Sequence, residues 1–267
     1  DLLRLAQSLE EDPTLISHLV LIASESILLT GLESVINSKA FTDEQLLRLQ
    51  AAFGEAESGE SMTRTIVAER CIGSSILKIP VPDLAKAFAQ MGGAAKNIDI
   101  EAYKKSSNSN VDFNFLLDRM DECVEATKLP FPKSLEAMSQ WAANMSKAKT
   151  KGYLFSGVLL PALDKALYKG AERVGRLRVT QAALAVERYR LAHQNTLPAS
   201  LAELAPQFID SVPADPFDGQ PLRYKKTSPK GFVIYSIGKD RTDEGGMPKP
   251  TGPSTDAPYD LTFAVRR

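Results

Sequence analysis

Histidine, cysteine and tryptophan are scarce in this sequence: its 267 residues include two histidines, two cysteines and one tryptophan. His18 and His193 belong to no H-E-x-x-H motif, and no Glu-x-x-His pair occurs, so the patterns of zinc proteases and di-iron bundles are missing. There is also no Gly-x-Ser-x-Gly elbow, no phosphate-binding glycine loop and no Gly-x-Gly-x-x-Gly fingerprint. Hydrolase, NTPase and dinucleotide-binding functions therefore lose their usual sequence support.

The chain also lacks a strong charge of either sign and a long uninterrupted apolar run. Its 32 lysines and arginines stand against 33 aspartates and glutamates, a net charge of -1. This balance supplies no field for gathering phosphate backbones and argues against a nucleic-acid partner. The most apolar stretch, residues 16–29, is interrupted by His18, Ser24 and Glu25, so we expect no membrane span there. A soluble globular chain of one or two domains is expected.

Residues 1–157 show the apolar periodicity of helices along most of their length. Asp12 and Pro13 begin a long amphipathic helix, and Thr42 with Gln45 forms a capping box for a second one. Residues 97–110 are polar and predict a loop. The expected helices cover residues 13–36, 42–53, 61–77, 112–127 and 133–146. These elements predict an all-helical domain over residues 1–157.

The second part of the chain changes character. Pro161 is a suitable first-turn residue for a long helix that we expect to run to about residue 194. A short helix over residues 199–204 follows, and alternating apolar residues predict strands over 222–226, 232–237 and 261–265. We therefore predict an α+β fold, in which the all-helical domain is followed by a long helix packed on a small antiparallel sheet over residues 158–267. The long helix has apolar residues on more than one face, so we expect the N-terminal helices to cover it.

Three motifs in the second part carry a resemblance to a known family. They are Leu-Pro-x-Ser-Leu-x-x-Leu over residues 197–204, Pro-x-Asp-Pro-Phe-x-Gly-x-Pro-Leu-x-Tyr over 213–224 and Gly-Phe-x-Ile-Tyr-Ser-Ile-Gly-x-Asp over 231–240. Asp215 can cap its turn with its carboxylate, and Gly219 turns the chain into the first strand. Residues 180–246 thus resemble the globular part of the type II secretion major pseudopilins, relatives of type IV pilins. The resemblance implies a long helix on a C-terminal sheet and covers about a quarter of the chain.

The resemblance also implies calcium binding by the loop that follows the second strand. In this sequence the loop contains several glycines and the acidic residues Asp240, Asp243, Glu244, Asp256 and Asp260, of which we expect the four aspartates to be the ligands. Hard carboxylate oxygens on a glycine-rich loop suit calcium, which takes six to eight oxygen ligands. We expect Asp240 to be the foremost ligand because it directly follows the best-matching segment. The alternative is an acidic surface loop whose carboxylates cap Asx turns.

These observations favour a non-enzymatic scaffold or binding protein of the bacterial cell envelope, with a pseudopilin-like module and a possible link to secretion. Its partners are expected to be envelope proteins rather than nucleic acid. The sequence begins at Asp1 without a basic and apolar leader, so the compartment cannot be read from it directly. The resemblance to pseudopilins implies an extracytoplasmic, periplasmic protein that is anchored to the membrane in its full-length form. Contact with the membrane is expected only through that anchor.

The alternative function is an envelope acyl-serine hydrolase. Ser75 and Lys78 form a Ser-x-x-Lys pair, in which a lysine one helical turn away could activate the serine. The same spacing occurs at two other places, and the accompanying Lys-Thr-Gly motif is missing, which favours coincidence.

The two cysteines, Cys71 and Cys123, allow one disulfide at most. A single bridge and two buried thiols are both compatible with their spacing. We favour unpaired, buried thiols within the helical domain because both cysteines have apolar neighbours on predicted helices.

Overall fold

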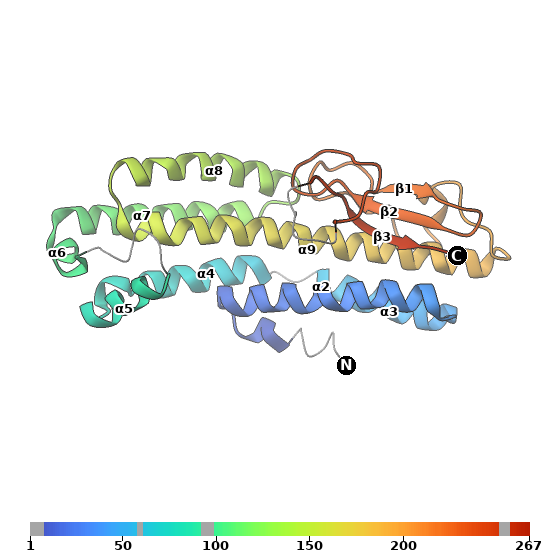
Figure 1. Cartoon of the computed structure of the whole chain (residues 1–267), viewed down its shortest axis with the longest axis horizontal. Helices are drawn as coiled ribbons and strands as arrows, with labels where there is room; N and C mark the ends of the chain where they lie inside the picture. Colours follow the sequence, from blue (N-terminus) through green and yellow to red (C-terminus); the bar gives the residue numbers. More distant parts are fainter. Residues whose placement is uncertain (1–7, 58–60, 92–98, 251–256) are drawn as a thin grey trace. The chain divides into compact units, whose positions relative to one another are not determined.

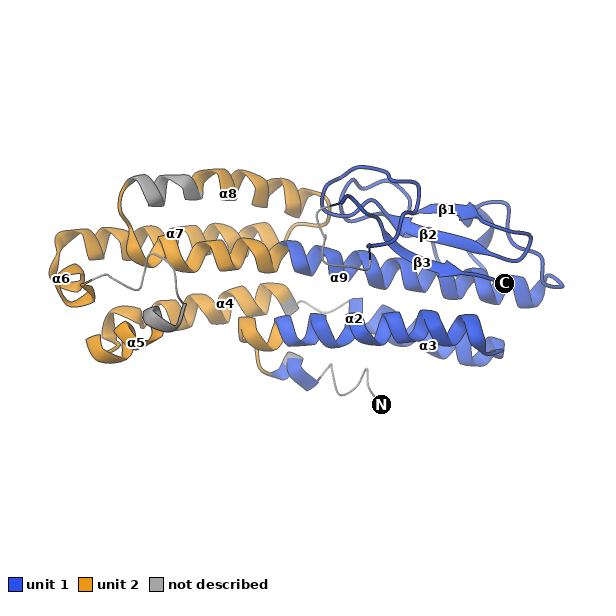
Figure 2. Cartoon of the chain, in the orientation of Figure 1, with its two compact units in different colours: residues 1–11, 19–60, 168–267 blue, residues 12–18, 61–167 orange. Residues whose placement is uncertain are grey.

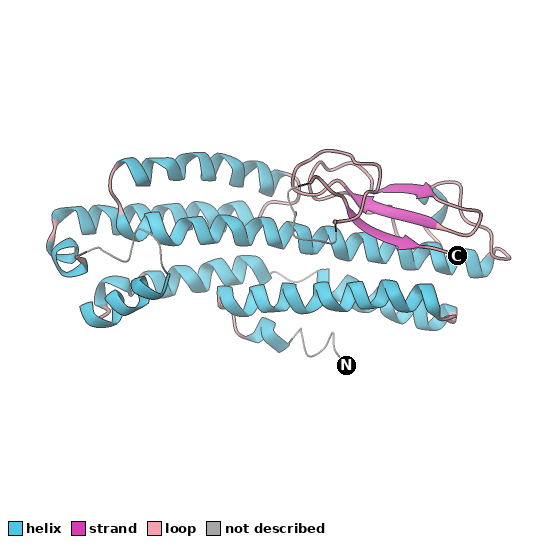
Figure 3. Cartoon of the chain, in the orientation of Figure 1, coloured by secondary structure: helices cyan, strands magenta, loops and turns pink. Residues whose placement is uncertain are grey.

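A computed structural model describes residues 8–57, 61–91, 99–250 and 257–267, which are mostly helical with one small sheet (Figures 1 and 3). The α-helices are α2 (Leu15–Ser38), α3 (Asp43–Glu57), α4 (Ser61–Gly73), α5 (Val81–Met91), α6 (Ile100–Lys105), α7 (Ser107–Thr127), α8 (Lys133–Thr150) and α9 (Leu154–Ala192). The 3-10 turns are η1 (Ser8–Glu11), η2 (Ile76–Lys78) and η4 (Leu201–Leu204), and the strands are β1 (Arg223–Lys226), β2 (Phe232–Ser236) and β3 (Leu261–Val265). The predicted α+β class is confirmed in this general form.

The chain divides into two compact units (Figure 2). Unit 1 comprises residues 1–11, 19–60 and 168–267, and unit 2 comprises residues 12–18 and 61–167. This division differs from the predicted boundary at residue 157, because residues 19–60 belong with the sheet and α9 contributes to both units. The physical reason lies in the core of unit 1: Leu29 and Ile36 of α2 and Phe53 of α3 pack in one cluster with α9 and the sheet. The expected covering of the long helix is thus confirmed for unit 1.

The sheet has the order β1-β2-β3, with both pairs antiparallel, as predicted from the alternation. Phe232 and Ile234 of β2 belong to the core cluster that contains α9. Val233 and Tyr235 point to the opposite face, as alternate residues of a strand must, yet they are 6% and 7% exposed. The loop after β2 covers them, since a Cβ on Gly246 would lie 3.1 Å from each of these side chains. Both faces of β2 are therefore buried.

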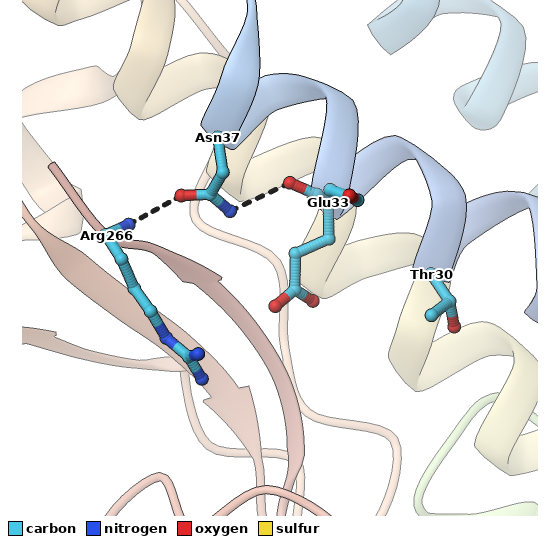
Figure 4. A pocket seen from close by; sticks show the side chains of 5 residues that line it. Thr30, Glu33, Asn37 and Arg266 are labelled. Atoms are coloured by element: carbon cyan, nitrogen blue, oxygen red, sulfur yellow. Dashed lines mark hydrogen bonds between the residues drawn. The ribbon is translucent and has the colours of Figure 1, made fainter.

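Helix α2 protects the free edge of β3. The Asn37 amide donates to the Ala264 carbonyl at 2.9 Å. The Asn37 side-chain oxygen accepts the Arg266 N–H at 2.7 Å (Figure 4). These are the bonds that a neighbouring strand would otherwise make, and an unprotected edge invites pairing with other chains. One helical side chain thus replaces part of a fourth strand.

Helix α2 is more apolar than the sequence analysis allowed. Its length and composition are those of a helix able to cross a membrane, and only 22% of its most apolar 18-residue stretch is buried. The interruptions at His18 and Glu25 do not prevent this, because two polar residues among so many apolar ones leave the mean hydropathy of the helix high. The expectation that residues 16–29 could not belong to a membrane-spanning helix was therefore wrong as far as length and composition are concerned.

Unit 2 contains the start of α9, which lies seven residues before the predicted one at Pro161. Asp112 of α7 is fully buried and accepts hydrogen bonds from the Phe155 and Ser156 N–H groups at 2.7 and 3.1 Å. The Tyr103 hydroxyl donates to Asp112 at 2.7 Å and accepts the Leu154 N–H at 3.0 Å. Because the first N–H groups of a helix have no partner within it, this distant carboxylate caps α9 in place of a local residue.

The loop predicted over residues 97–110 was wrong for the part that the structure describes. Asp99 caps α6 by accepting the Ala102 N–H at 2.9 Å, and α7 begins at Ser107. The polar residues of this segment act in part as caps: Ser109 is buried and donates to backbone carbonyls of Lys104 and Ser106. Residues 97 and 98 lie outside the described residues.

Both cysteines are unpaired, as predicted, but only one is buried. Cys123 is buried in the core of unit 2, and this burial, together with the nearby Asp164, raises the pKa of its thiol to about 12. Cys71 is exposed, so the expectation of burial was wrong at this position. Cys71 lies on α4, whose buried side there is occupied by other residues such as Ile66.

Candidate functional site

The loop from Gly238 to Met247 is the segment in which the sequence predicts a calcium site. Its backbone has positive φ at Gly238, Arg241, Gly245 and Gly246, with values of 70°, 59°, 71° and 83°. Such angles suit glycine, which has no Cβ to clash. Gly246 is doubly constrained, because it also lies close against β2. The backbone therefore bends sharply several times within this short loop, and the loop stays packed against the sheet.

Two of the predicted ligands lie on the outside of this loop. Asp240 is exposed and its carboxylate accepts the Thr242 N–H at 3.3 Å. Asp243 is also exposed and accepts the Gly245 N–H at 2.8 Å. Both are Asx turns, the arrangement that the sequence analysis gave as the alternative to metal binding. Asp256, a third predicted ligand, lies outside the described residues.

Asp260, the fourth predicted ligand, organises the loop from its far end. It is 1% exposed, and its Oδ2 accepts the N–H groups of Gly246 at 2.7 Å and Met247 at 3.2 Å. Its own N–H donates to the Met247 carbonyl at 2.9 Å. Its Oδ1, by contrast, is buried and has no hydrogen-bond partner among the described residues. A buried oxygen of this kind costs free energy unless something pairs with it.

A second unpaired carboxylate oxygen belongs to Glu244. Its Oε1 accepts the Thr242 hydroxyl, whereas its Oε2 is buried without a hydrogen-bond partner in the described part of the chain. Burial raises the pKa of Asp260 and the negative charge of Glu244 raises it further, against the lowering effect of the loop amides. A cation placed between the two carboxylates would offset the repulsion that Asp260 meets from Glu244.

The unpaired oxygens of Asp260 and Glu244 suit a hard cation, and of these two residues only Asp260 was an expected ligand. Within the described ranges, no group of three or more His, Cys, Asp and Glu side chains is placed to hold a metal. Asp260 and Glu244 supply two carboxylates, so backbone carbonyls and water would have to complete a calcium shell. Glu244 was not among the four expected ligands. Asp243 and Glu244 are adjacent acidic residues followed by Gly245, and nothing in this order shows which of the two side chains turns inward.

Asp215 fixes the start of the same loop. Its carboxylate is fully buried and accepts the Phe217 N–H at 3.0 Å, which confirms the predicted turn cap. It also accepts the Ser236 hydroxyl at 2.8 Å and the Ile237 N–H at 2.9 Å, at the end of β2. Arg223 of β1 donates to it at 2.7 Å. Asp215 thus joins the turn before the sheet to the point where the loop leaves it.

A separate open cleft of about 400 Å³ lies on unit 1 and is lined by Thr30, Glu33, Ser34, Asn37 and Arg266 (Figure 4). Burial raises the pKa of Glu33, while the Ala264 N–H and the positive charges of Arg266 and Arg176 lower it. Glu33 and Asn37, one helical turn apart, both interact with the backbone of β3. Glu33 and Asn37 in this cleft therefore bind backbone groups at the edge of β3.

The alternative catalytic pair lies in unit 2. Ser75 and Lys78 are both exposed on the turn η2, where the Lys78 N–H donates to the Ser75 carbonyl at 2.8 Å. In the described part of the chain, Ser75 and Lys78 are linked by this backbone hydrogen bond, and no hydrogen bond joins their side chains. A lysine activates a serine when it is close to the hydroxyl and desolvated. On this turn Lys78 is exposed, so its amine is not desolvated.

Comparisons with known proteins add no relative: no family model, no curated protein and no solved structure matches the chain.

Proposed function

We propose that this chain is a non-enzymatic scaffold or binding protein of the bacterial cell envelope with a pseudopilin-like module at its C-terminal end. The observation that carries the proposal is the arrangement in unit 1. The C-terminal part of α9 packs on a three-stranded antiparallel sheet, and the loop between β2 and β3 is closed by the buried Asp260. This is the arrangement that the resemblance to pseudopilins implies.

In this proposal the protein works outside the cytoplasm, in the periplasm, held by an anchor that precedes the chain, and its partners are envelope proteins connected with secretion. The Pro-x-Asp-Pro turn supports the proposal, because its Asp215 joins Phe217, just after the turn, to Ser236 and Ile237 at the end of β2. The module would serve as a rigid end on which partners assemble.

Cell fractionation and an activity-based probe test this function together. A tagged full-length protein in its native bacterium should be found with the envelope fraction, and a fluorophosphonate probe should form no adduct at Ser75. Recovery in the cytoplasm would contradict the envelope role. An adduct at Ser75 that disappears in Ser75→Ala would contradict the non-enzymatic role and favour the acyl-serine hydrolase.

The second part of the proposal is that the loop binds calcium through Asp260 and Glu244. Calcium at 10 to 100 times its dissociation constant should stabilise the fold by about 1.4 to 2.7 kcal/mol. The melting temperature of the wild-type chain should therefore rise with calcium, and Asp260→Asn and Glu244→Gln should each flatten that rise. Magnesium should substitute poorly, because it requires a regular octahedral shell.

Asp240→Asn is the matched control. If Asp240 only caps its Asx turn, as its contact with Thr242 suggests, this variant keeps the response to calcium. A lost response would identify Asp240 as a ligand, as the sequence predicts. A melting temperature of the wild type that stays flat up to millimolar calcium would contradict the calcium site altogether.

The response to calcium should also depend on pH in a defined direction. Because burial raises the pKa of Asp260 above its usual 3.8, the metal-free folded state keeps the proton of this carboxyl to a higher pH than the unfolded chain does. Its contribution to stability is full below the usual pKa and is lost as the pH rises through the raised value. Calcium requires the ionised form, so the gain from calcium should grow over the same range. Melting curves with and without calcium across this range measure the effect.

A further inference from the structure

The exposed side of α2 carries no charged residue, although the helix contains three ionisable ones. α2 is described along its whole length, and His18 and Glu25 are 3% and 1% exposed. Glu33 is half-buried and faces the edge of β3 (Figure 4). The exposed residues of α2 within unit 1, called the outer face below, are Leu19, Val20, Ala23, Ile27, Thr30, Gly31, Ser34, Val35 and Ser38.

This distribution is the reverse of that on α3, the other N-terminal helix of unit 1. The exposed residues of α3 include Asp43, Glu44, Arg48 and Glu55, as expected for a helix that faces water. On α2 the charges point inward and the exposed residues are apolar or small. Ile27 is 76% exposed and Val20 is 46% exposed. A helix face of this kind is typical of a surface that is covered by a partner.

Gly31 is a second observation that points to close approach by another helix. A Cβ at this position would meet no atom within 4 Å, so no contact within the chain requires glycine. Glycine in the middle of a helix lowers its stability relative to alanine. Gly31 and Ala23 lie one turn to either side of Ile27, and Ser34 continues the small residues. Small side chains at such positions let a second helix backbone come near.

We propose that a second copy of this chain docks on the outer face of α2 through its own α2. An uncharged face can meet itself across a two-fold axis without like-charge repulsion, which is what a symmetric dimer requires. Residues 19–38 provide a contact about 30 Å long at 1.5 Å per residue. The large side chain of Ile27 would fill the space beside the small residues of the partner's helix.

A lipid surface is a poorer occupant of this face. Helices that lie on membranes have lysine or arginine along their border and aromatic residues at the interface. Among the residues of α2, which the structure describes completely, there is no lysine, arginine, tryptophan or tyrosine. A strongly charged protein partner would find no complementary charge among the outer-face residues, and the charges that border the face, Glu33 and Arg266, lie in the cleft beside Thr30 and Ser34.

Sedimentation equilibrium of the full chain tests the dimer. The wild type should be a dimer at micromolar concentration, and Ile27→Glu should weaken dimerisation about 100-fold or more, because two carboxylates would be brought together in an apolar contact. Ile27 is largely exposed, so the variant should fold normally, as circular dichroism would show. Leu47→Glu on α3 is the matched control, since Leu47 is also exposed, at 46%, and should leave the dimer unchanged.

Site-specific crosslinking gives a second measurement. In a Cys71→Ser background, Ile27→Cys should form a disulfide-linked dimer under mild oxidation, and Leu47→Cys should not. A monomeric wild type at about 100 µM would overturn the proposal, and so would an Ile27→Glu variant that dimerises as well as the wild type. If a monomeric wild type, but not Ile27→Glu, sediments with phosphatidylcholine vesicles, the occupant is a membrane and the dimer is wrong.

Discussion

Replacing Asp215 with alanine is expected to destabilise unit 1 by about 3 to 5 kcal/mol. The change leaves the buried Ile237 N–H, the Phe217 N–H and the Ser236 hydroxyl without the acceptor they now share. Each such group costs roughly 1 to 3 kcal/mol when buried and unpaired. Arg223 keeps a partner in Asp218, so the loss arises mainly from the neutral donors.

The two units can be followed separately in this experiment. The single tryptophan, Trp141, is buried in unit 2, so its fluorescence reports that unit, whereas circular dichroism reports both. Asp215→Ala should lower the denaturant midpoint measured by circular dichroism more than the midpoint measured by fluorescence. Asp218→Ala, which removes a half-buried carboxylate from the same turn, is the control and should cost clearly less. Equal effects of the two variants would contradict the central role of Asp215.

The sheet could be predicted from the sequence because its signals are local. The three strands were expected within one residue of their observed ends, since alternation of apolar side chains reflects the two faces of a strand. The cap formed by Asp215 was also predictable, because Asx turns act over two residues. Signals of this range are contained in the motif itself and need no knowledge of the tertiary fold.

The parts that could not be predicted depend on residues far apart in the chain. The start of α9 is capped by Asp112, about 40 residues earlier, and so no local cap marks it. The edge of β3 is covered by Asn37, more than 200 residues away. In the sequence, Asn37 is simply a polar residue near a helix end.

The candidate metal site shows the same limit within a single loop. The sequence identified a stretch rich in aspartate, and Asp260 proved to be its buried anchor. It also favoured Asp240, which is exposed, and passed over Glu244, whose Oε2 is buried. Which acidic side chains turn inward depends on the positive φ angles of this loop and on its contact with β2. Composition alone does not contain that information.

Among the described residues of unit 1, Arg173 on α9 and Glu25 on α2 form a deeply buried ion pair. Nε and Nη2 of Arg173 lie 2.5 and 2.9 Å from the two carboxylate oxygens of Glu25, and Nη2 also donates to the Ala56 carbonyl of α3 at 3.0 Å. Their side chains are 5% and 2% exposed. The sequence showed Glu25 only as an interruption of an apolar run. Its partner lies 148 residues away and joins three helices of the unit.

Breaking this pair from one side should be severe. Arg173→Met leaves the carboxylate of Glu25 buried without its counter-charge, and we expect a loss of about 3 to 5 kcal/mol; Glu25→Leu should cost a similar amount. The double variant should recover most of the loss, since an apolar pair often replaces a buried ion pair without cost. Urea unfolding of the four proteins measures the coupling. If the single losses simply add in the double variant, the two side chains do not act as a pair.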